Sequence, residues 1–359
     1  MACCQACRSC CDGAQSHKKD SVWTWIVCVA AATNLAFTVG LIYSFGVLLP
    51  VLMDYFKENR ERTAWVGSLS IAVCQGCGPF VGSLVNRFGC QKVSIAGCVT
   101  CAISLTVASF ANDLAILYVC YAVFGGGASC VFLSSLEIVR KCFDQWRSIA
   151  LGITSAGQGL GTMVLSQILQ SLVSSLSWRN SLRVVAGCLA ITSFFGLLYD
   201  SKIDTASISE MHTSEEAEQR RTSKRFTFHC SVWRVPGFPV LTVLFSFVMF
   251  GRATVFVHLV KYCEDRGMSF DASSRLLLFM GIQIVVGRFA CGFLCSYKRL
   301  DNWYINRSLL LVNGTSTILL TLAQNYDAFI AYAVLFGFCD GAWATVNNIQ
   351  SLTCVDQSE

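Results

Sequence analysis

The stretch Ser273–Ser296, SSRLLLFMGIQIVVGRFACGFLCS, is long and apolar enough to cross a lipid bilayer, yet it carries an arginine well inside the run. At a rise of about 1.5 Å per residue, Arg288 lies roughly 21 Å from the outer end, if Ser274 marks that end. A guanidinium at this depth costs on the order of 3 kcal/mol or more, and such groups usually face the interior of a helix bundle. The stretch therefore predicts a membrane helix whose arginine needs a partner.

The composition extends this prediction to the whole chain. Its 359 residues are 54% hydrophobic and 14% charged, with a mean hydropathy of +0.55, whereas a soluble domain carries about 25% charge. The first apolar run begins at Trp23 and is too long for a signal peptide, and no small-residue cleavage site is evident. We expect an all-α, multi-pass membrane protein, and the net charge of +5 says little about nucleic acid.

Ten apolar runs predict ten transmembrane helices, with boundaries near 23–49, 63–85, 92–111, 114–139, 148–173, 181–199, 238–260, 274–296, 304–323 and 328–352. A polar segment rich in charge and Ser/Thr separates six of these runs from the other four, and we interpret it as a disordered cytoplasmic linker. The predicted organisation is a Cys-rich cytoplasmic tail (1–22), a six-helix bundle (23–199), the linker (200–237), an incomplete four-helix bundle (238–352) and a C-terminal tail (353–359).

The distribution of basic residues predicts the orientation. Lysine and arginine are roughly twice as frequent in the segments that lie inside when the N-terminus is cytoplasmic. Both termini are therefore predicted to be cytoplasmic. The sequons at Asn306 and Asn313 then fall at the inner face and within the membrane, and we expect neither to be glycosylated.

Most of the 21 cysteines lie inside apolar runs, where they behave as small hydrophobic residues; examples are Cys74, Cys77, Cys98, Cys101, Cys130, Cys188 and Cys291. The N-terminal tail holds a separate group, Cys3, Cys4, Cys7, Cys10 and Cys11. No second ligand pair follows at zinc-finger spacing, so we predict no metal site. Reversible palmitoylation beside the first helix and unmodified reduced thiols are the two alternatives for this group.

Asp340, in the run 328–352, lies about 19 Å from its outer end. The helices of Asp340 and Arg288 run in the same direction, so the two charges share almost the same depth, and we predict that they pair. The pair is either static or opens when a substrate binds.

Two other residues are candidates for contact with a substrate. Arg252 lies roughly 13 Å from the outer end of the run 238–260, without an evident acidic partner. It either binds an anion in a cavity or extends to the surface and caps backbone carbonyls. Asn34 in the first run either faces a cavity or forms hydrogen bonds between helices.

Glycine is frequent in the fourth and fifth runs, at Gly125, Gly126, Gly127, Gly152, Gly157, Gly159 and Gly161. Small residues let helices approach closely, which serves either sliding or static packing. A basic turn with the residues Gly82, Asn86, Arg87, Gly89 and Lys92 is predicted on the inner side as a conformational gating loop. Glu137, one helical turn from Arg140, is interpreted as part of an interfacial salt bridge.

Several motifs together resemble the monocarboxylate transporter family (solute carrier family 16) of the major facilitator superfamily. The segment Asp20–Trp25, DSVWTW, is similar to a signature of that family's first helix, and Cys142–Gly161, CFDQWRSIALGITSAGQGLG, resembles the second signature. Gly82–Gly89, GSLVNRFG, is similar to the superfamily's loop between helices 2 and 3. The segments Phe256–Ser269 and Gly281–Phe293 match the family's helix 7–8 region.

The resemblance implies a transporter, and departures from the family pattern narrow the expected substrate. The lactate carriers' buried lysine and the aspartate before their helix 8 arginine align with Val47 and Ile284, whereas Arg288 is retained. We therefore expect no proton–lactate symport, and the pattern is more similar to branches that carry larger metabolites. The family has twelve helices, so the chain is interpreted as C-terminally shortened, or as one to which another chain supplies two helices.

The sequence thus predicts alternating-access transport of a monocarboxylate or related small organic metabolite across the plasma membrane, without a cofactor. The predicted substrate-binding or gating residues are Arg288, Asp340, Arg252 and Asn34, around a cavity between helices 1, 4 and 5 and helices 7, 8 and 10. The alternative is a non-transporting regulator or decoy of full-length carriers. No set of residues typical of an enzyme is recognised. The predicted partners are the substrate, the bilayer and, as the resemblance implies for some members, a single-span immunoglobulin-type escort subunit.

Overall fold

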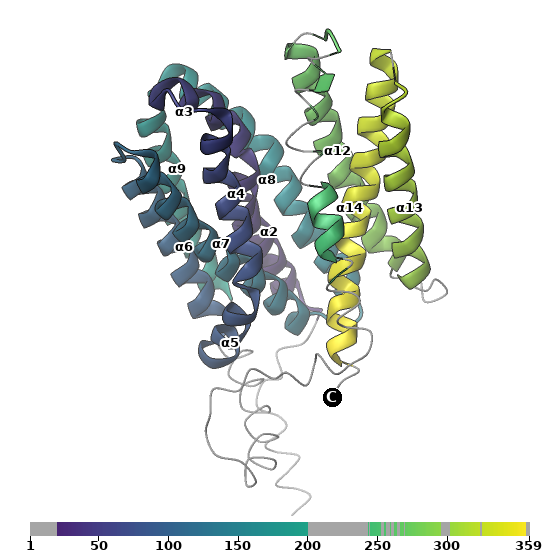
Figure 1. Ribbon diagram of the computed structural model, residues 1–359. Helices are drawn as coiled ribbons and strands as arrows, with labels where there is room; N and C mark the ends of the chain where they lie inside the picture. The colour runs from purple at the N-terminus through teal and green to yellow at the C-terminus, as the bar shows by residue number, and fades with distance from the viewer. Residues whose placement is uncertain are drawn as a thin grey trace, which may run out of the picture.

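The computed structural model is all-helical in the residues it describes, which are 20–199, 243, 245–252, 255, 259, 262–263, 266–268, 270–295, 302–323 and 325–356. Figure 1 shows two neighbouring groups of helices, one containing α2–α9 and the other α12–α14. The linker 200–237 and the tail cysteines lie outside the described residues, as does most of the predicted span 238–260, of which residues 245–252 are helical.

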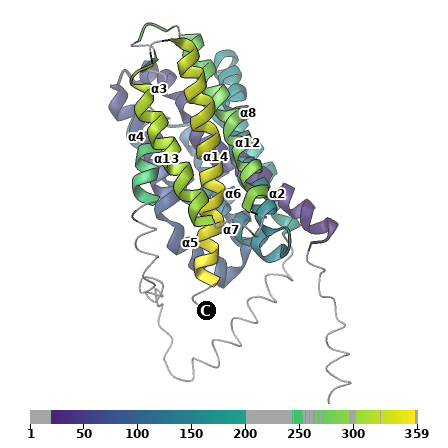
Figure 2. The same cartoon turned by 90° about the vertical axis from the view of Figure 1, so that its right-hand side faces the viewer.

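The first group begins with a long rod made of α2 (Val22–Tyr43), η1 (Ser44–Val47) and α3 (Leu48–Phe56). It continues with α4 (Arg60–Gly76), α5 (Gly78–Phe88), α6 (Cys90–Ala108), α7 (Leu114–Cys142), α8 (Arg147–Ser175), α9 (Trp178–Thr192) and η2 (Ser193–Leu198). The second group contains α12 (Phe270–Cys295), α13 (Asn302–Leu320) and α14 (Tyr326–Asp356). Figure 2 shows these three helices side by side.

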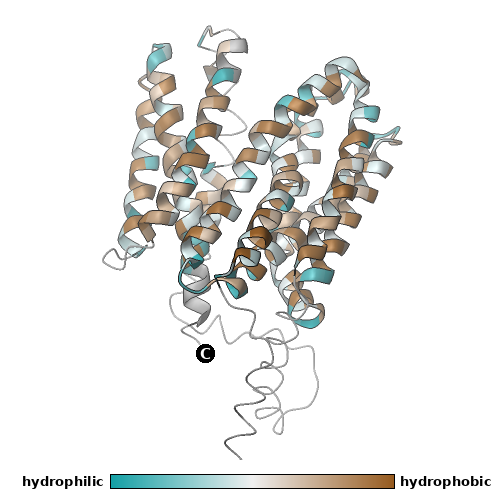
Figure 3. Cartoon of the chain, turned by 180° about the vertical axis from the view of Figure 1, so that it is seen from behind, coloured by the Kyte–Doolittle hydropathy of each residue, from teal (hydrophilic) through white to brown (hydrophobic). Residues whose placement is uncertain are grey.

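Within the described residues, seven helices are long and apolar enough to span a membrane, or eight if a bent pair forms one span. The count of ten predicted from the sequence is therefore not confirmed. The run 304–323 does fold into a helix, α13, but its Asn306, Arg307 and Asn313 make it less apolar than the others. Hydrophobic residues are spread along the whole length of the helices (Figure 3), which is typical of a multi-pass membrane protein.

The bent pair consists of α4 and α5, whose axes differ by 51°. Pro79 stands in the first turn of α5. Proline has no backbone N–H and its ring clashes with the preceding turn, so a straight helix cannot continue through this position. The sequence-based span 63–85 is therefore two helices that meet at Cys77.

Glycines set the closest helix contacts. A Cβ atom placed on Gly40 of α2 would lie 2.7 Å from the carbonyl carbon of Gly161 in α8, and one on Gly337 of α14 would lie 2.5 Å from the carbonyl oxygen of Met280 in α12. Only glycine permits such approaches, so these helices pack backbone against backbone. The structure thus agrees with the close-packing role predicted for the glycines of α8.

The two helix groups meet where α8 packs against α12. A Cβ atom on Gly152 would lie 3.3 Å from both the carbonyl oxygen of Arg288 and the Cα of Gly292. In Figure 1, α8 and α12 face each other at the border between the groups. The arginine that was conspicuous in the sequence is therefore placed at this border.

The two signature stretches near the chain's start and after α7 contact each other. The backbone N–H of Asp20 donates to the carbonyl oxygen of Cys142 at 3.4 Å, and the Asp20 carboxylate accepts from the N–H of Gln145 at 3.3 Å. The rings of Trp25 and Phe143 pack edge to face with centroids 4.9 Å apart. Both motifs therefore form one structural unit at the start of the first helix.

Candidate functional site

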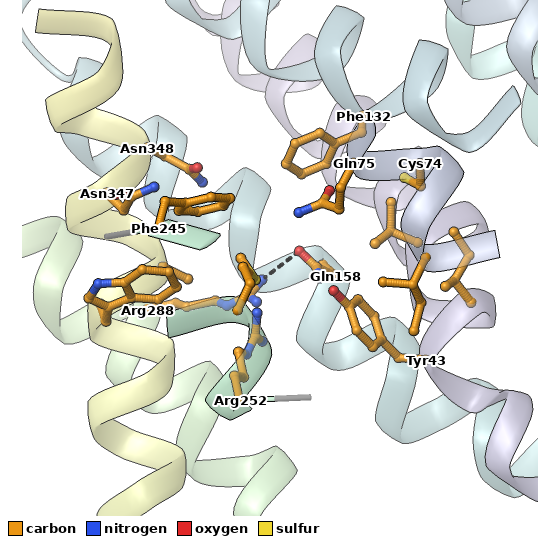
Figure 4. Close-up of a pocket in the computed structure, with 16 residues that line it drawn as sticks. Tyr43, Cys74, Gln75, Phe132, Gln158, Phe245, Arg252, Arg288, Asn347 and Asn348 are labelled. Atoms are coloured by element: carbon orange, nitrogen blue, oxygen red, sulfur yellow. Dashed lines mark hydrogen bonds between the residues drawn. The ribbon is translucent and has the colours of Figure 1, made fainter. Parts of the chain in front are cut away.

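A cavity lies between the two helix groups and holds about 650 Å³ of empty space, counted with the part open to solvent. Figure 4 shows the side chains around it. The first group contributes Val39, Ile42, Tyr43, Ile71, Cys74, Gln75, Phe132 and Gln158, and the second contributes Phe245, Met249, Arg252, Arg288, Trp343, Ala344, Asn347 and Asn348. The lining helices match those predicted from the sequence, with the addition of α4.

Arg252 and Asp340 form a buried ion pair beside this cavity. The Nε atom of Arg252 lies 2.7 Å from Oδ1 of Asp340, and the two side chains are only 10% and 2% exposed. The guanidinium of Arg252 also lies 5.8 Å from the ring centroid of Tyr43, across the border between the groups. This distance is within the range of a cation–π interaction.

The predicted pairing of Arg288 with Asp340 is therefore wrong, as is the statement that Arg252 has no acidic partner. Matching depths alone led to that prediction, because the Cα of Arg252 is about 6 Å nearer the outer end than that of Asp340. An arginine side chain is long enough to bridge such a difference in depth. The direction in which each helix presents its side chain decided the partner.

Arg288 instead reaches across to α8. It is 2% exposed, and its Nη1 donates to the carbonyl oxygen of Ser155 and to Oε1 of Gln158, the latter at 3.4 Å. Its Nε is buried without a hydrogen-bond partner among the described residues, and so is Oδ2 of Asp340. The acceptors of Arg288 are thus neutral, and part of its hydrogen-bonding capacity is unused.

The three buried charges leave the cavity electropositive. The two guanidinium groups of Arg252 and Arg288 and the single carboxylate of Asp340 together carry a net charge of +1. Because the carboxylate is committed to Arg252, the positive charge of Arg288 has no direct counterion within the described residues. A cationic, hydrogen-bonding group in a largely apolar cavity is suited to binding an anion.

The rest of the lining consists of amides and aromatic rings. The amide side chains of Gln75, Gln158, Asn347 and Asn348 all line the cavity. Phe245 and Trp343 are stacked with ring centroids 5.7 Å apart. This combination provides hydrogen bonds for a polar substituent and apolar faces for an organic body.

Asn34 does not line the cavity. Its side chain is completely buried, and Nδ2 donates to the hydroxyl of Tyr199 at 3.3 Å. Tyr199 in turn lies 2.9 Å from the hydroxyl of Ser135. Of the two roles predicted for Asn34, the structure favours hydrogen bonding between helices.

Val47 and Ile284, the positions aligned with the lactate carriers' lysine and aspartate, are also away from the cavity lining. Val47 packs against the hydrophobic core of the first group. Ile284 is 6% exposed and adjoins Gly341 of α14 and Gly159 of α8. Neither position can provide a titratable group beside Arg288.

The predicted gating loop is the turn between α5 and α6. Gly89 ends α5 with a φ of 84°, which favours glycine. Asn86, Arg87 and Lys92 are exposed, whereas Gly82 lies earlier, within α5. Arg87 stands over the ring of Phe88 at 5.4 Å from its centroid. A gating role for this turn stays a prediction.

Two further interpretations from the sequence are confirmed. Glu137 and Arg140 form a salt bridge with an N–O distance of 2.6 Å. The membrane cysteines named from the sequence are free thiols, and most are buried. They are Cys74, Cys77, Cys98, Cys101, Cys130, Cys188 and Cys291.

Gln158 and Gln75 were not predicted from the sequence to line the cavity. Each is an uncharged polar residue within an apolar run, and Gln158 is flanked by two glycines. The pair Asn347–Asn348 has the same character. Amide side chains inside membrane helices, and not only charged ones, were the feature of the sequence that could have identified these cavity residues.

Comparisons with known proteins agree with this architecture. Residues 26–356 match the family model of the Major Facilitator Superfamily. Monocarboxylate transporter 12 of Xenopus laevis is 26% identical over 91% of this chain and 75% of its own length. Monocarboxylate transporter 10 of Mus musculus is 25% identical over 90% of this chain and 65% of its own length. Monocarboxylate transporter 4 of Gallus gallus is 26% identical over 90% of this chain and 68% of its own length.

Proposed function

This chain belongs to the Major Facilitator Superfamily, and we propose that it carries monocarboxylates by alternating access. Its family and its similarity to monocarboxylate transporters make it a multi-pass transporter of small organic substrates. The observation that carries the proposal is Arg288, a buried guanidinium in the cavity between the two helix groups whose hydrogen-bond acceptors are neutral. A carboxylate is well suited to such a guanidinium, because it accepts two parallel hydrogen bonds.

In this proposal the three buried charges have different tasks. Asp340 neutralises Arg252, so Arg288 is left to bind the substrate's carboxylate. The amides and the stacked rings of Phe245 and Trp343 contact the remainder of the substrate. The position of the cavity at the border between the groups supports alternating access, since a rocking motion of one group against the other exposes such a site to each side in turn.

We further propose that the transport is not proton–lactate symport and takes place at the plasma membrane, with both termini in the cytoplasm. The first part is supported by Ile284, which is apolar and packed between helices where the lactate carriers have an aspartate. The orientation is supported by the excess of basic residues in the inner segments.

Uptake of radiolabelled pyruvate and phenylpyruvate into cells or proteoliposomes tests the proposal, with Arg288→Ala as the variant and Arg307→Ala as the control. Arg307 is exposed on α13 and lies outside the cavity lining. Hydrogen bonds to a charged group contribute about 1.5–3 kcal/mol, so losing Arg288 should weaken binding roughly tenfold or more and abolish saturable uptake.

Surface biotinylation should show both variants in the membrane at the level of the parent protein. Normal saturable uptake by Arg288→Ala would contradict the site assignment. If the parent protein transports neither probe but alters the flux of a co-expressed carrier, the regulatory alternative predicted from the sequence is the better account.

A further inference from the structure

Gln158 connects the two helix groups through Arg288. Its Oε1 accepts a hydrogen bond from Nη1 of Arg288 at 3.4 Å, as the dashed line in Figure 4 marks. The same Nη1 donates to the carbonyl oxygen of Ser155, one helical turn earlier on α8. Asn348 of α14 adds a third contact, because its Nδ2 donates to Oγ of Ser155 at 3.2 Å. One face of α8 thus holds two residues of the other group.

The backbone around Gln158 is fixed on both sides. A Cβ atom on Gly157 would meet the backbone of Ala32 in α2, and one on Gly159 would lie 3.2 Å from a methyl carbon of Val285 in α12. Because the backbone of α8 is packed closely against both neighbours, the side chain of Gln158 can leave Arg288 more readily than the helix can move. The carboxamide is half-buried and lines the cavity, so it has space to turn into.

Gln158 is also a weak acceptor for a guanidinium. The carboxamide oxygen is neutral, and a donor–acceptor distance of 3.4 Å lies beyond the usual range of about 2.7–3.2 Å. A carboxylate forms shorter and roughly twice as strong hydrogen bonds with arginine. A carboxylate that enters the cavity therefore outcompetes Gln158 for Arg288.

We propose that Gln158 is a specificity-determining residue, whose carboxamide holds Arg288 in the substrate-free cavity and is displaced by the carboxylate of the substrate. The inference rests on the proposed function, in which Arg288 binds that carboxylate. Displacement removes a contact between α8 and α12, so binding loosens the border between the two groups. When the substrate leaves, Gln158 again accepts a hydrogen bond from Arg288, and this competition assists release of the substrate.

The charge of the cavity fits the monocarboxylate substrate of the proposed function. The net charge of +1 from Arg252, Arg288 and Asp340 is balanced by one carboxylate. A dicarboxylate would leave one negative charge without a partner in an apolar cavity. Gln158, being neutral, keeps the cavity selective for monoanions, and a glutamate at this position would neutralise it internally.

Gln158→Leu and Gln158→Glu test the proposal in opposite directions. The leucine variant keeps the carbonyl of Ser155 but lacks the side-chain competitor for Arg288, so KM for phenylpyruvate should fall two- to fivefold, and the maximal rate should fall because release is slower. The glutamate variant holds Arg288 with an internal carboxylate, so KM should rise at least tenfold. Gln170→Leu is the matched control, because Gln170 lies on the same helix, is exposed and is outside the cavity lining, so this substitution should leave KM within twofold.

The assay is initial-rate uptake of radiolabelled phenylpyruvate, with unlabelled 2-oxoglutarate as the dianionic competitor and surface biotinylation to normalise the amount of protein. Phenylpyruvate should compete at least tenfold better than 2-oxoglutarate in the parent protein. Should Gln158→Glu fail to reach the surface, Gln158→Asn replaces it; its shorter side chain loses Arg288 and should lower KM as Gln158→Leu does.

Parallel changes of KM in the leucine and glutamate variants would overturn the inference, as would a rise of KM in both the leucine and asparagine variants. These results differ from a failure of the proposed function. If Arg288→Ala transports phenylpyruvate with an unchanged KM, the carboxylate site itself is misassigned, whatever the Gln158 variants show.

Discussion

Replacing Asp340 with asparagine tests the arrangement of the buried charges most directly. The substitution keeps the shape of the side chain but removes the only carboxylate that contacts Arg252 within the described residues. Arg252 then loses this carboxylate in the membrane interior. We expect the variant to fold less stably and the loss to depend on the presence of Arg252.

The size of the effect follows from the burial of the pair. The two atoms are 2.7 Å apart, and the side chains are 10% and 2% exposed, so water screens the interaction very little. Breaking such a pair by removing one partner typically costs about 3–5 kcal/mol. Asparagine still offers a carbonyl oxygen to the guanidinium, so we expect a value near the lower end, about 3 kcal/mol.

A double-mutant cycle isolates the pair from other effects. The variants are Asp340→Asn, Arg252→Met and the double substitution, with unfolding of the purified protein followed in detergent against temperature and denaturant. Because the double variant removes both members of the pair, it should be more stable, by about 2 kcal/mol or more, than the sum of the single effects predicts. A second cycle with Arg288→Met and Asp340→Asn should give a clearly smaller coupling energy.

A larger coupling energy in the second cycle would contradict the pairing of Arg252 with Asp340. In that case Asp340 interacts mainly with Arg288, as matching depth in the sequence suggested. Additive effects in the first cycle would also refute it, since two groups in direct contact cannot contribute independently.

Three other predictions concern packing and access. Gly161→Ala should lower the free energy of unfolding by about 2 kcal/mol or more in a thermal unfolding assay, because its Cβ would meet the backbone of Ala36. Gly187→Ala is the control and should be neutral in the same assay, because the space around Gly187 is open. Asn34→Val should lower the free energy of unfolding by about 1–2 kcal/mol in that assay, because its buried hydrogen bond to a tyrosine is lost. KM for phenylpyruvate should stay within twofold, and a large rise of KM would indicate that Asn34 contacts the substrate. Cys74 lines the cavity but is only 6% exposed, so N-ethylmaleimide should inactivate uptake slowly through this thiol, and phenylpyruvate should slow inactivation further; an equally sensitive Cys74→Ser variant would contradict this.

Much of the fold follows from the sequence alone. Apolar runs of about twenty residues can satisfy their backbone groups in a bilayer only as helices, so the runs that form α2, α6–α9, α12 and α14 were predictable. The polar residues Asn306 and Asn313 already mark α13 as a weaker candidate for a span. The burial of Arg288 also followed from the sequence, because a charge at that depth has to face the bundle interior.

The bend between α4 and α5 was not predicted, although the sequence contains residues that favour it. Pro79 follows Gly78 inside an apolar run, and these two residues favour a break. Hydropathy alone is insensitive to this, since it averages over the run. The cavity residues Cys74 and Gln75 lie just before the break. The prediction of one straight helix was therefore wrong next to the site.

The partners inside the cavity were decided by the tertiary structure. The helical rise gives the depth of a residue in the membrane, but not the rotation of its helix about its own axis, which depends on how neighbouring helices pack. Close packing of α8 against α2 and α12 turns Gln158 toward Arg288, and the helix of Arg252 presents its side chain to Asp340. The sequence therefore determined that charged residues lie inside apolar runs, while the packing of helices determined which of them pair and which has only neutral acceptors among the described residues.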